Sequence, residues 1–206
     1  MTSNPSQVGS ISNVHVIEDF VQGEVLEQWR QDSSRAEYSR GMFTSHADSS
    51  SLLNFNEYVR EIEDTASYVF GVPLTRYDGN GLLNKWSVGD SLAKHIDAPT
   101  DFEQFLGKNI KDPPSAILYS SIVYLNDDYK GGDIHFTGHN VTISPSAGSL
   151  LLFPATSMYP HEVKEITLGN RYTFTLFLSN PDIINMFRRL FLIAEQAHSE
   201  KRNDEK

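Results

Sequence analysis

Three residues with a characteristic spacing could bind a single metal ion: His95 and Asp97, separated by one residue, and His161 further along the chain. Together they can offer two imidazole nitrogens and one carboxylate oxygen to one face of a divalent ion. This arrangement leaves the opposite positions open, as in non-heme Fe(II) oxygenases. Arg171 follows on the next apolar run and could hold a carboxylate-bearing cosubstrate beside the metal. The spacing therefore indicates oxygenase chemistry, with these four residues as the catalytic candidates.

The His-x-acid pattern is common by chance, so its surroundings decide its meaning. The same pattern begins at His46, in a Ser-rich segment, and at His198, in the charged C-terminal tail, and neither segment predicts a rigid frame. His95 and Asp97 instead lie on a predicted strand, where residues two apart point to the same face. The pair at residue 95 is therefore the one expected to bind metal.

Two further histidines compete as ligands. His135 and His139 are spaced as on one helical face, but the neighbouring Gly131, Gly132 and Gly138 argue against a helix. We interpret His135 as a strand residue and His139 as the tip of the next turn. His15 is expected to pack as part of the first strand.

Composition narrows the class of protein. The chain has 206 residues, 39% of them hydrophobic, which suits a single globular domain. It contains no cysteine, so any metal site must use nitrogen and oxygen ligands, as Fe(II), Mn(II) or Zn(II) accept. The net charge of −10 repels phosphate backbones and argues against nucleic-acid binding. Because signal-peptide and membrane-spanning patterns are also absent, we expect a cytoplasmic protein without membrane contact.

The N-terminal part predicts helices. Residues 1–12 are expected to be disordered, and a first strand is predicted at 14–17. Apolar spacing predicts a helix over 18–29 and a second helix from the capping residue Asn54 to about residue 70. The polar, Ser-rich composition of residues 31–51 predicts a long surface loop between them.

Short β-like runs separated by glycine and proline fill the rest of the chain. An amphipathic helix is expected at 182–196, before the tail at 198–206. The pattern predicts a mainly β fold with flanking helices, an antiparallel barrel or jelly roll, in one domain over 13–197. The predicted strands are 83–86, 91–96, 116–125, 133–136, 141–143, 149–153, 161–166 and 171–178.

The last predicted strand has two different faces. Arg171, Thr173 and Thr175 share one face, and apolar residues occupy the other. A guanidinium flanked by threonines on a strand suggests a cation directed into the mouth of a barrel.

The segments WSVGDSLAKHID, YLNDDYKGGDIHF, ISPSAGSLLLFP and YPHEVKEITLGNRYTFTLF resemble the 2-oxoglutarate- and Fe(II)-dependent dioxygenases, and most closely the prolyl 4-hydroxylase branch. The resemblance covers about residues 82–179. It implies a double-stranded β-helix in which His95, Asp97 and His161 bind Fe(II). Arg171 would then form a bidentate salt bridge with the distal carboxylate of 2-oxoglutarate.

The resemblance also implies further pocket residues. Tyr124 matches a tyrosine whose hydroxyl helps to hold 2-oxoglutarate, Thr173 and Thr175 would add hydrogen bonds, and Trp86 stands where many relatives have a pocket tyrosine. Members of the family use O2, release succinate and CO2, and hydroxylate an unactivated C–H bond; ascorbate is the expected reductant.

The expected substrate is a prolyl residue of a peptide or protein. The alternatives are an oxygenase of the same family acting on a free amino acid or other small molecule, and a non-catalytic cupin-like binding module. The insert APTDFEQFLGKNIKDPPS is expected to form a mobile loop over the substrate. The apolar face of the predicted C-terminal helix could pack on the barrel or on a second copy, so both a monomer and a homodimer are compatible with the sequence.

Overall fold

The computed structural model describes residues 11–38, 44–47, 52–77, 81–98 and 117–186, together with residues 189 and 193. In these ranges the strands form a larger sheet, a smaller sheet and a short pair. The larger sheet contains β1 (His15–Ile17), β2 (Thr44–Ala47), β3 (Thr75–Arg76), β4 (Gly81–Trp86), β6 (Tyr119–Tyr124), β10 (Leu150–Pro154) and β13 (Arg171–Ser179). The smaller sheet contains β5 (Leu92–His95), β8 (Ile134–Phe136), β9 (Val141–Ile143) and β11 (His161–Val163), and the pair is β7 (Lys130–Gly131) with β12 (Ile166–Leu168).

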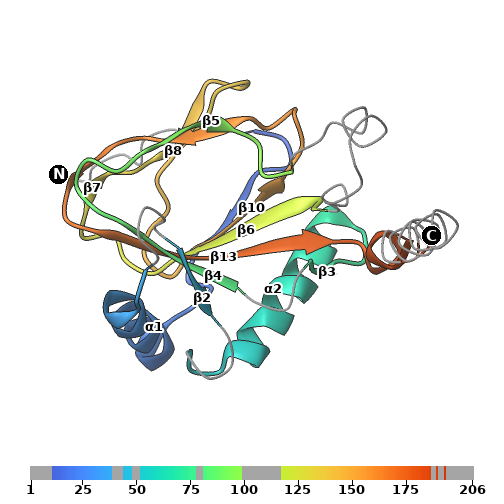
Figure 1. Ribbon diagram of the computed structural model, residues 1–206, viewed down its shortest axis with the longest axis horizontal. Coiled ribbons are helices and arrows are strands. Elements are labelled where there is room, and N and C mark those ends of the chain that lie inside the picture. The colour runs from blue at the N-terminus through green and yellow to red at the C-terminus, as the bar shows by residue number, and fades with distance from the viewer. Residues whose placement is uncertain are drawn as a thin grey trace, which may run out of the picture.

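The two sheets face each other and are antiparallel throughout (Figure 1). The larger is ordered β1-β10-β6-β13-β4-β2, with β3 beside β13, and the smaller is ordered β5-β11-β8-β9. Strands far apart in the chain thus become neighbours, as in a jelly roll. The predicted mainly β fold, a double-stranded β-helix flanked by helices, is confirmed.

The central strand β13 shows why the sheet is buried on both faces. Phe174, Leu176 and Leu178 belong to the core beneath the sheet, whereas the alternate residues Arg171 and Thr173 line the space between the sheets. The period of two follows from strand geometry. The two faces of this strand therefore contribute to the core and to the cavity, respectively.

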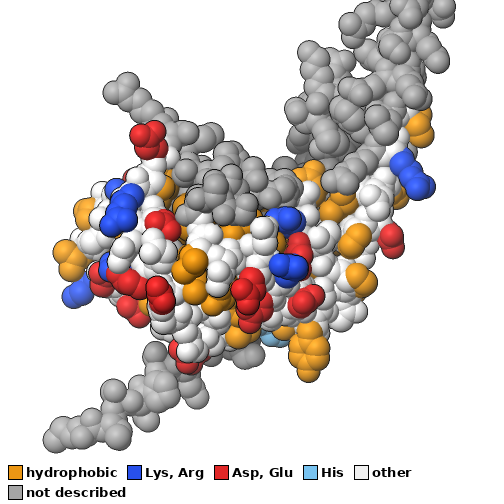
Figure 2. Space-filling model, turned by 90° about the horizontal axis from the view of Figure 1, so that it is seen from below, with side chains coloured by type: hydrophobic (Ala, Val, Ile, Leu, Met, Phe, Trp, Pro, Cys, Tyr) orange, Lys and Arg blue, Asp and Glu red, His pale blue; other side chains and the backbone are white. Residues whose placement is uncertain are grey.

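Two helices cover the outer face of the larger sheet (Figure 1). They are α1 (Gly23–Arg35) and α2 (Phe55–Phe70). Trp29 of α1 is fully buried, donates its indole N–H to the Leu53 carbonyl at 2.8 Å, and packs edge-on against Phe174 and Tyr58. Seen from the helix side, Figure 2 shows charged side chains of both signs on the exposed surface. Each helix thus buries one face against the sheet.

The first helix differs from the prediction over 18–29: it begins at Gly23 and ends at Arg35. Asp19 and Gly23 have positive φ angles of 56° and 58°, and Val21 donates its backbone N–H to Gly148. A helix cannot pass through such a segment, so Val21 joins the core from a bend that precedes the helix. The predicted loop over 31–51 is wrong where the helix continues and where β2 pairs with β4.

Smaller differences concern the ends of elements. Asn54 occupies the predicted position at the start of α2, but its backbone is left-handed, with φ 55°, and its side chain makes no capping hydrogen bond. The predicted strand over 161–166 divides into β11 and β12, which pair with different strands. The predicted disorder over 1–12 is wrong for Ile11, which is buried in the core.

Some expectations fall outside the described residues: the disorder of residues 1–10, the loop over 99–116 and the tail. The C-terminal helix is present at 181–186, with helical conformation also at 189 and 193. Within the described part of the chain, no helix combines the length and apolar character needed to cross a membrane.

Candidate metal and cosubstrate site

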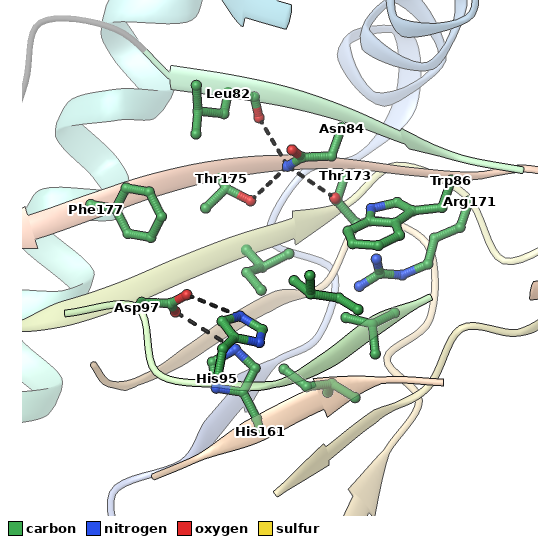
Figure 3. Close-up of a pocket in the computed structure, with 14 residues that line it drawn as sticks. Leu82, Asn84, Trp86, His95, Asp97, His161, Arg171, Thr173, Thr175 and Phe177 are labelled. Atoms are coloured by element: carbon green, nitrogen blue, oxygen red, sulfur yellow. Dashed lines mark hydrogen bonds and ion pairs between the residues drawn. The ribbon is translucent and has the colours of Figure 1, made fainter. Parts of the chain in front are cut away.

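A cavity of about 340 Å³ lies between the two sheets. One wall comes from β4 and β13 of the larger sheet, and the other from β5 and β11 of the smaller one (Figure 3). Its walls combine polar side chains with aliphatic and aromatic ones. The lining residues are Leu82, Asn84, Trp86, Leu92, His95, Asp97, Ile122, Ile134, His161, Val163, Arg171, Thr173, Thr175 and Phe177.

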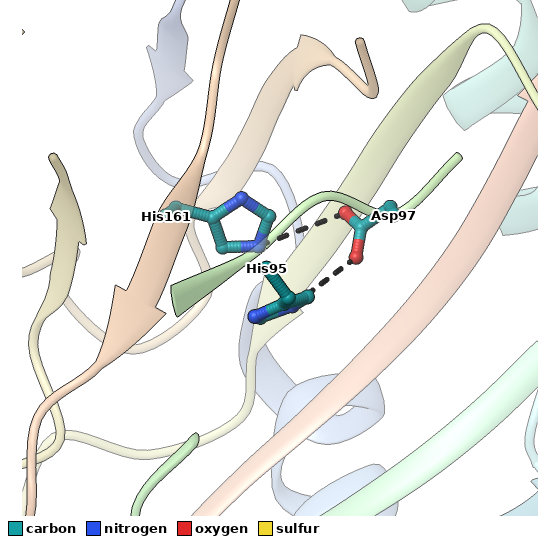
Figure 4. A group of neighbouring side chains, drawn as sticks. All are labelled: His95, Asp97 and His161. Carbon is teal, nitrogen blue, oxygen red and sulfur yellow. Dashed lines mark ion pairs between the residues drawn. The ribbon is translucent and has the colours of Figure 1, made fainter. Parts of the chain in front are cut away.

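His95, Asp97 and His161 meet at the side of the cavity formed by the smaller sheet (Figure 4). His161 on β11 lies directly opposite His95 on β5 in the antiparallel register. The prediction that Asp97 shares the strand of His95 is wrong, because β5 ends at His95 and Asp97 lies in a bend just beyond it. Asp97 Oδ1 lies 3.5 Å from His95 Nε2, and Oδ2 lies 3.8 Å from His161 Nε2. Strand pairing, rather than proximity in the chain, therefore completes this group.

Backbone carbonyls fix the orientation of both imidazoles. His95 Nδ1 lies 2.9 Å from the Ala93 carbonyl, and His161 Nδ1 lies 3.2 Å from the Tyr159 carbonyl. A carbonyl can only accept, so each Nδ1 carries a proton, and each Nε2 is left facing Asp97 as the atom that could bind a metal. Metal-binding histidines are held in the same way in known sites.

Asp97 is held by a neighbour from the larger sheet. The Ser120 hydroxyl donates to Asp97 Oδ2 at 2.5 Å. Burial by itself would raise the pKa of Asp97, but the hydrogen bonds from His95 and Ser120 and the nearby His161 keep the pKa below its usual value. The side chain is therefore a carboxylate, the form that a metal requires.

The two histidines differ in their surroundings. The hydrogen bond with Asp97 raises the pKa of His95, whereas burial lowers the pKa of His161. His161 is only 3% exposed and packs edge-on against Phe153, with Phe136 also adjacent. An apolar shell therefore surrounds the inner imidazole, while His95 faces the cavity.

The donor set fits a divalent ion. The three ligand atoms lie within 4.8 Å of one another. With metal–ligand bonds of about 2.1 Å, neighbouring ligand atoms would be roughly 3 Å apart, so small side-chain rotations suffice. Two nitrogens and one oxygen favour iron, manganese or zinc over calcium or magnesium.

Arg171 lies at the far end of the cavity from these three residues (Figure 3). It is only 2% exposed, and its guanidinium lies over the rings of Tyr124 and Trp86, at 4.9 and 5.6 Å from their centroids. Arg171 Nη2 donates to the Tyr124 hydroxyl at 3.1 Å, whereas the buried Nε has no hydrogen-bond partner within the described part of the chain. No carboxylate there forms a salt bridge with it. A buried cation without a counter-charge suits an anionic ligand.

A glycine makes room for the arginine stem. A Cβ on Gly132 would lie 2.3 Å from Ile166 Cδ1 and 3.1 Å from Arg171 Cδ, and both Gly131 and Gly132 have positive φ. Tyr129 lies beside the same guanidinium, where burial raises its pKa to about 12. This turn therefore holds the arginine stem close to the backbone.

The predicted site residues are distributed as follows. His95, Asp97, His161, Arg171, Thr173, Thr175 and Trp86 all line the one cavity. Tyr124 is not among the residues that line the cavity: its ring belongs to a core cluster, and its hydroxyl accepts a hydrogen bond from Arg171.

The other histidines lie elsewhere, as predicted: His135 on β8 contacts Thr142, and His139 in a turn contacts the Met158 carbonyl. His15 packs edge-on against Phe70. His46 lies on β2, and its side chain is outside the described part of the structure.

Sequence reasoning missed Asn84, Ser120 and Tyr129. Asn84 could have been found, because it lies two residues before Trp86 on the same strand and therefore on the same face. Ser120 and Tyr129 carry no such signal, since only the packing of distant strands brings them to Asp97 and Arg171.

Comparison with known proteins finds similarity over about half of the chain. Residues 81–179 match the family model described as the 2OG-Fe(II) oxygenase superfamily. Among curated proteins, mouse prolyl 3-hydroxylase 3 is 36% identical over 78 residues, and rat prolyl 3-hydroxylase 2 is 30% identical over 87 residues. These matches cover 34% and 39% of this chain, but only 11% and 12% of the relatives. The chain therefore spans a small part of the curated proteins that it matches.

Solved structures share the fold over most of the chain. A viral collagen prolyl hydroxylase from Paramecium bursaria Chlorella virus-1 superposes with a TM-score of 0.61 at 12% identity, covering 82% of this chain and 96% of that one. A Pseudomonas putida prolyl-4-hydroxylase gives a TM-score of 0.59 at 17% identity, covering 82% and 92%. A Trichoplax adhaerens prolyl hydroxylase, solved with a hypoxia-inducible-factor peptide, gives 0.58 at 16% identity, covering 84% and 86%.

Proposed function

We infer that this chain, whose residues 81–179 match the model of the 2OG-Fe(II) oxygenase superfamily, is a member of that superfamily and a 2-oxoglutarate-dependent dioxygenase that hydroxylates a prolyl residue of a peptide or protein. One observation carries the proposal. A buried guanidinium without a counter-charge shares a single cavity with two histidines and a carboxylate that fit a divalent metal. A site for an anionic cosubstrate beside a metal is what this reaction needs.

Each residue has a defined task in this reaction. His95, Asp97 and His161 would hold Fe(II), which supplies O2 activation and the oxidation of a C–H bond when 2-oxoglutarate is bound. Arg171 would bind the distal carboxylate of 2-oxoglutarate through two parallel N–H donors. Tyr124 accepts a hydrogen bond from Arg171, which leaves its own hydroxyl proton free, and that proton would be donated to the same carboxylate.

The walls of the cavity support an apolar reacting group. Ile122, Ile134 and Val163 line the same cavity as the proposed metal ligands. Such walls exclude water and would accept the ring of a proline better than a charged side chain. The names of the relatives support the same class of substrate, with 3-hydroxylases among the curated proteins and a 4-hydroxylase among the solved structures.

The test is succinate release from 2-oxoglutarate with Fe(II), O2 and a proline-containing peptide. His161→Ala should abolish release, whereas His135→Ala, which removes a histidine from the neighbouring strand, should preserve it. Mass and NMR analysis of the peptide would then distinguish 3- from 4-hydroxylation. Release with a free amino acid but with no peptide would favour the small-molecule alternative.

Absence of 2-oxoglutarate binding to the metal-loaded protein would instead support the cupin-like binding module. Three further expectations belong to the proposal: stimulation by ascorbate, a peptide or protein as partner, and a cytoplasmic location. Sedimentation of the protein would determine whether it is a monomer or a homodimer.

A further inference from the structure

A row of three polar side chains forms the wall of the cavity opposite the metal-binding group (Figure 3). Thr173 and Thr175 follow Arg171 along the cavity face of β13, and Asn84 lies on the adjacent strand, β4. Their exposed fractions are 1%, 9% and 8%. Polar groups buried to this extent need hydrogen bonds, so the direction of each bond matters.

The amide of Asn84 is the donor in this row. Its Nδ2 lies 3.0 Å from Thr175 Oγ1, 3.5 Å from Thr173 Oγ1 and 3.4 Å from the Leu82 carbonyl. The Leu82 carbonyl can only accept, so the amide atom facing all three oxygens must be the NH2 group. The orientation of the amide is therefore determined by the backbone of its own strand.

The threonine hydroxyls consequently accept from Asn84 and keep their own protons for another partner. No acceptor for Thr173 Oγ1 or Thr175 Oγ1 occurs among the hydrogen bonds of the described residues. Both hydroxyls line the cavity, on the same strand face as the guanidinium. The wall thus offers O–H donors next to a cation, which is a surface suited to the oxygens of an organic acid.

We propose that Asn84 is a positioning residue that directs the Thr173 and Thr175 hydroxyl protons into the cavity, as hydrogen-bond donors to the oxygens of bound 2-oxoglutarate. This inference rests on the proposed function. It assigns Asn84 an effect that passes through the two threonines, without contact between the amide and the cosubstrate.

A mutant cycle tests this indirect route. The dissociation constant of 2-oxoglutarate is measured calorimetrically with the Mn(II)-loaded protein for the wild type, Asn84→Leu, Thr173→Val/Thr175→Val and the triple variant. Asn84→Leu should weaken binding about 3- to 10-fold, the range of one or two neutral hydrogen bonds. In the double-valine background the same substitution should change it less than about 2-fold, because the hydroxyls that it orients are gone.

Mn(II) affinity measured on the same samples is the control, and it should be unchanged in every variant. If Asn84→Leu does not fold, Asn84→Ala replaces it in the cycle, since it leaves space instead of filling it. Equal losses in the two backgrounds, or no loss in the wild-type background, would overturn the inference. A wild-type protein that binds Mn(II) but not 2-oxoglutarate would overturn the proposed function itself, and the two failures are therefore distinguishable.

Discussion

At the scale of single residues, the site depends on charges placed where water cannot reach them. Arg171 is the clearest case, since its guanidinium lies over the rings of Tyr124 and Trp86 and lacks a carboxylate partner within the described residues. Burying a cation in this way costs folding free energy unless a ligand compensates it. The buried arginine is therefore best explained as a binding residue for an anionic ligand.

Replacing this arginine by lysine tests the geometry of the contact, because the charge is kept and the planar fork is lost. We expect Arg171→Lys to weaken 2-oxoglutarate binding roughly 10- to 100-fold, the range of a charged hydrogen bond. Titration of the Mn(II)-loaded protein measures it. Arg30→Lys on the surface of α1 is the matched control and should bind normally. Equal affinities of Arg171→Lys and the wild type would contradict bidentate binding.

A second residue acts on the metal through its ligand. Ser120 donates to Asp97 Oδ2, so Ser120→Ala should leave the carboxylate free to rotate and lower Mn(II) affinity about 10- to 100-fold. Ser121→Ala provides the control, because the neighbouring hydroxyl is also buried but donates to the Leu176 carbonyl. Equal losses in the two variants would mean that strand β6 is disturbed rather than Asp97.

At the scale of elements, β13 connects the core to the cavity. One face packs on Trp29 of α1 and on α2, and the other carries the guanidinium and the threonines. The helices therefore hold in place the strand that presents the proposed cosubstrate residues, although neither helix lines the cavity.

Removing the main contact of α1 should weaken this support. Trp29→Ala deletes a fully buried indole and its hydrogen bond to the Leu53 carbonyl, and should lower the free energy of unfolding by about 3–5 kcal/mol. Chemical denaturation measures the loss. Arg30→Ala, on the exposed face of the same helix, removes only a surface ion pair and should cost no more than about 1 kcal/mol. Similar losses for both would indicate that α1 is not packed as described.

At the scale of the whole molecule, the cavity exists only because two sheets close on each other. The metal ligands come mainly from the smaller sheet and the arginine from the larger one. Any ligand that contacts both sheets must therefore stabilise the folded state relative to the unfolded chain.

The thermal midpoint should report this coupling. With Mn(II) bound and 2-oxoglutarate at a hundred times its dissociation constant, the added stability is about 2.7 kcal/mol. For a chain of this length, that corresponds to a rise in Tm of roughly 5–10 °C. Chelation with EDTA should remove the 2-oxoglutarate effect, and Asp97→Ala should behave like the chelated wild type. A rise that persists in both would mean that the acid binds elsewhere.

Local patterns in the sequence determined much of the fold. The period of two in β13 separated core from cavity residues, and short runs between glycines located most strands, because side-chain alternation is a property of the strand itself. The His-x-Asp pair, His161 and Arg171 were also recognisable from residue type and spacing. The start of α1 was not, because a backbone contact between Val21 and Gly148 determines it.

Only the tertiary structure decided which distant side chains meet. Strand pairing placed His161 opposite His95. It also brought Ser120 within hydrogen-bonding distance of Asp97, and Asn84 within hydrogen-bonding distance of the threonines of β13. These contacts depend on the register between strands far apart in the chain, and a shift of one residue would turn each side chain to the other face. The sequence by itself thus determined the chemical groups and the faces they occupy. The closing of one sheet on the other determined the site that they form.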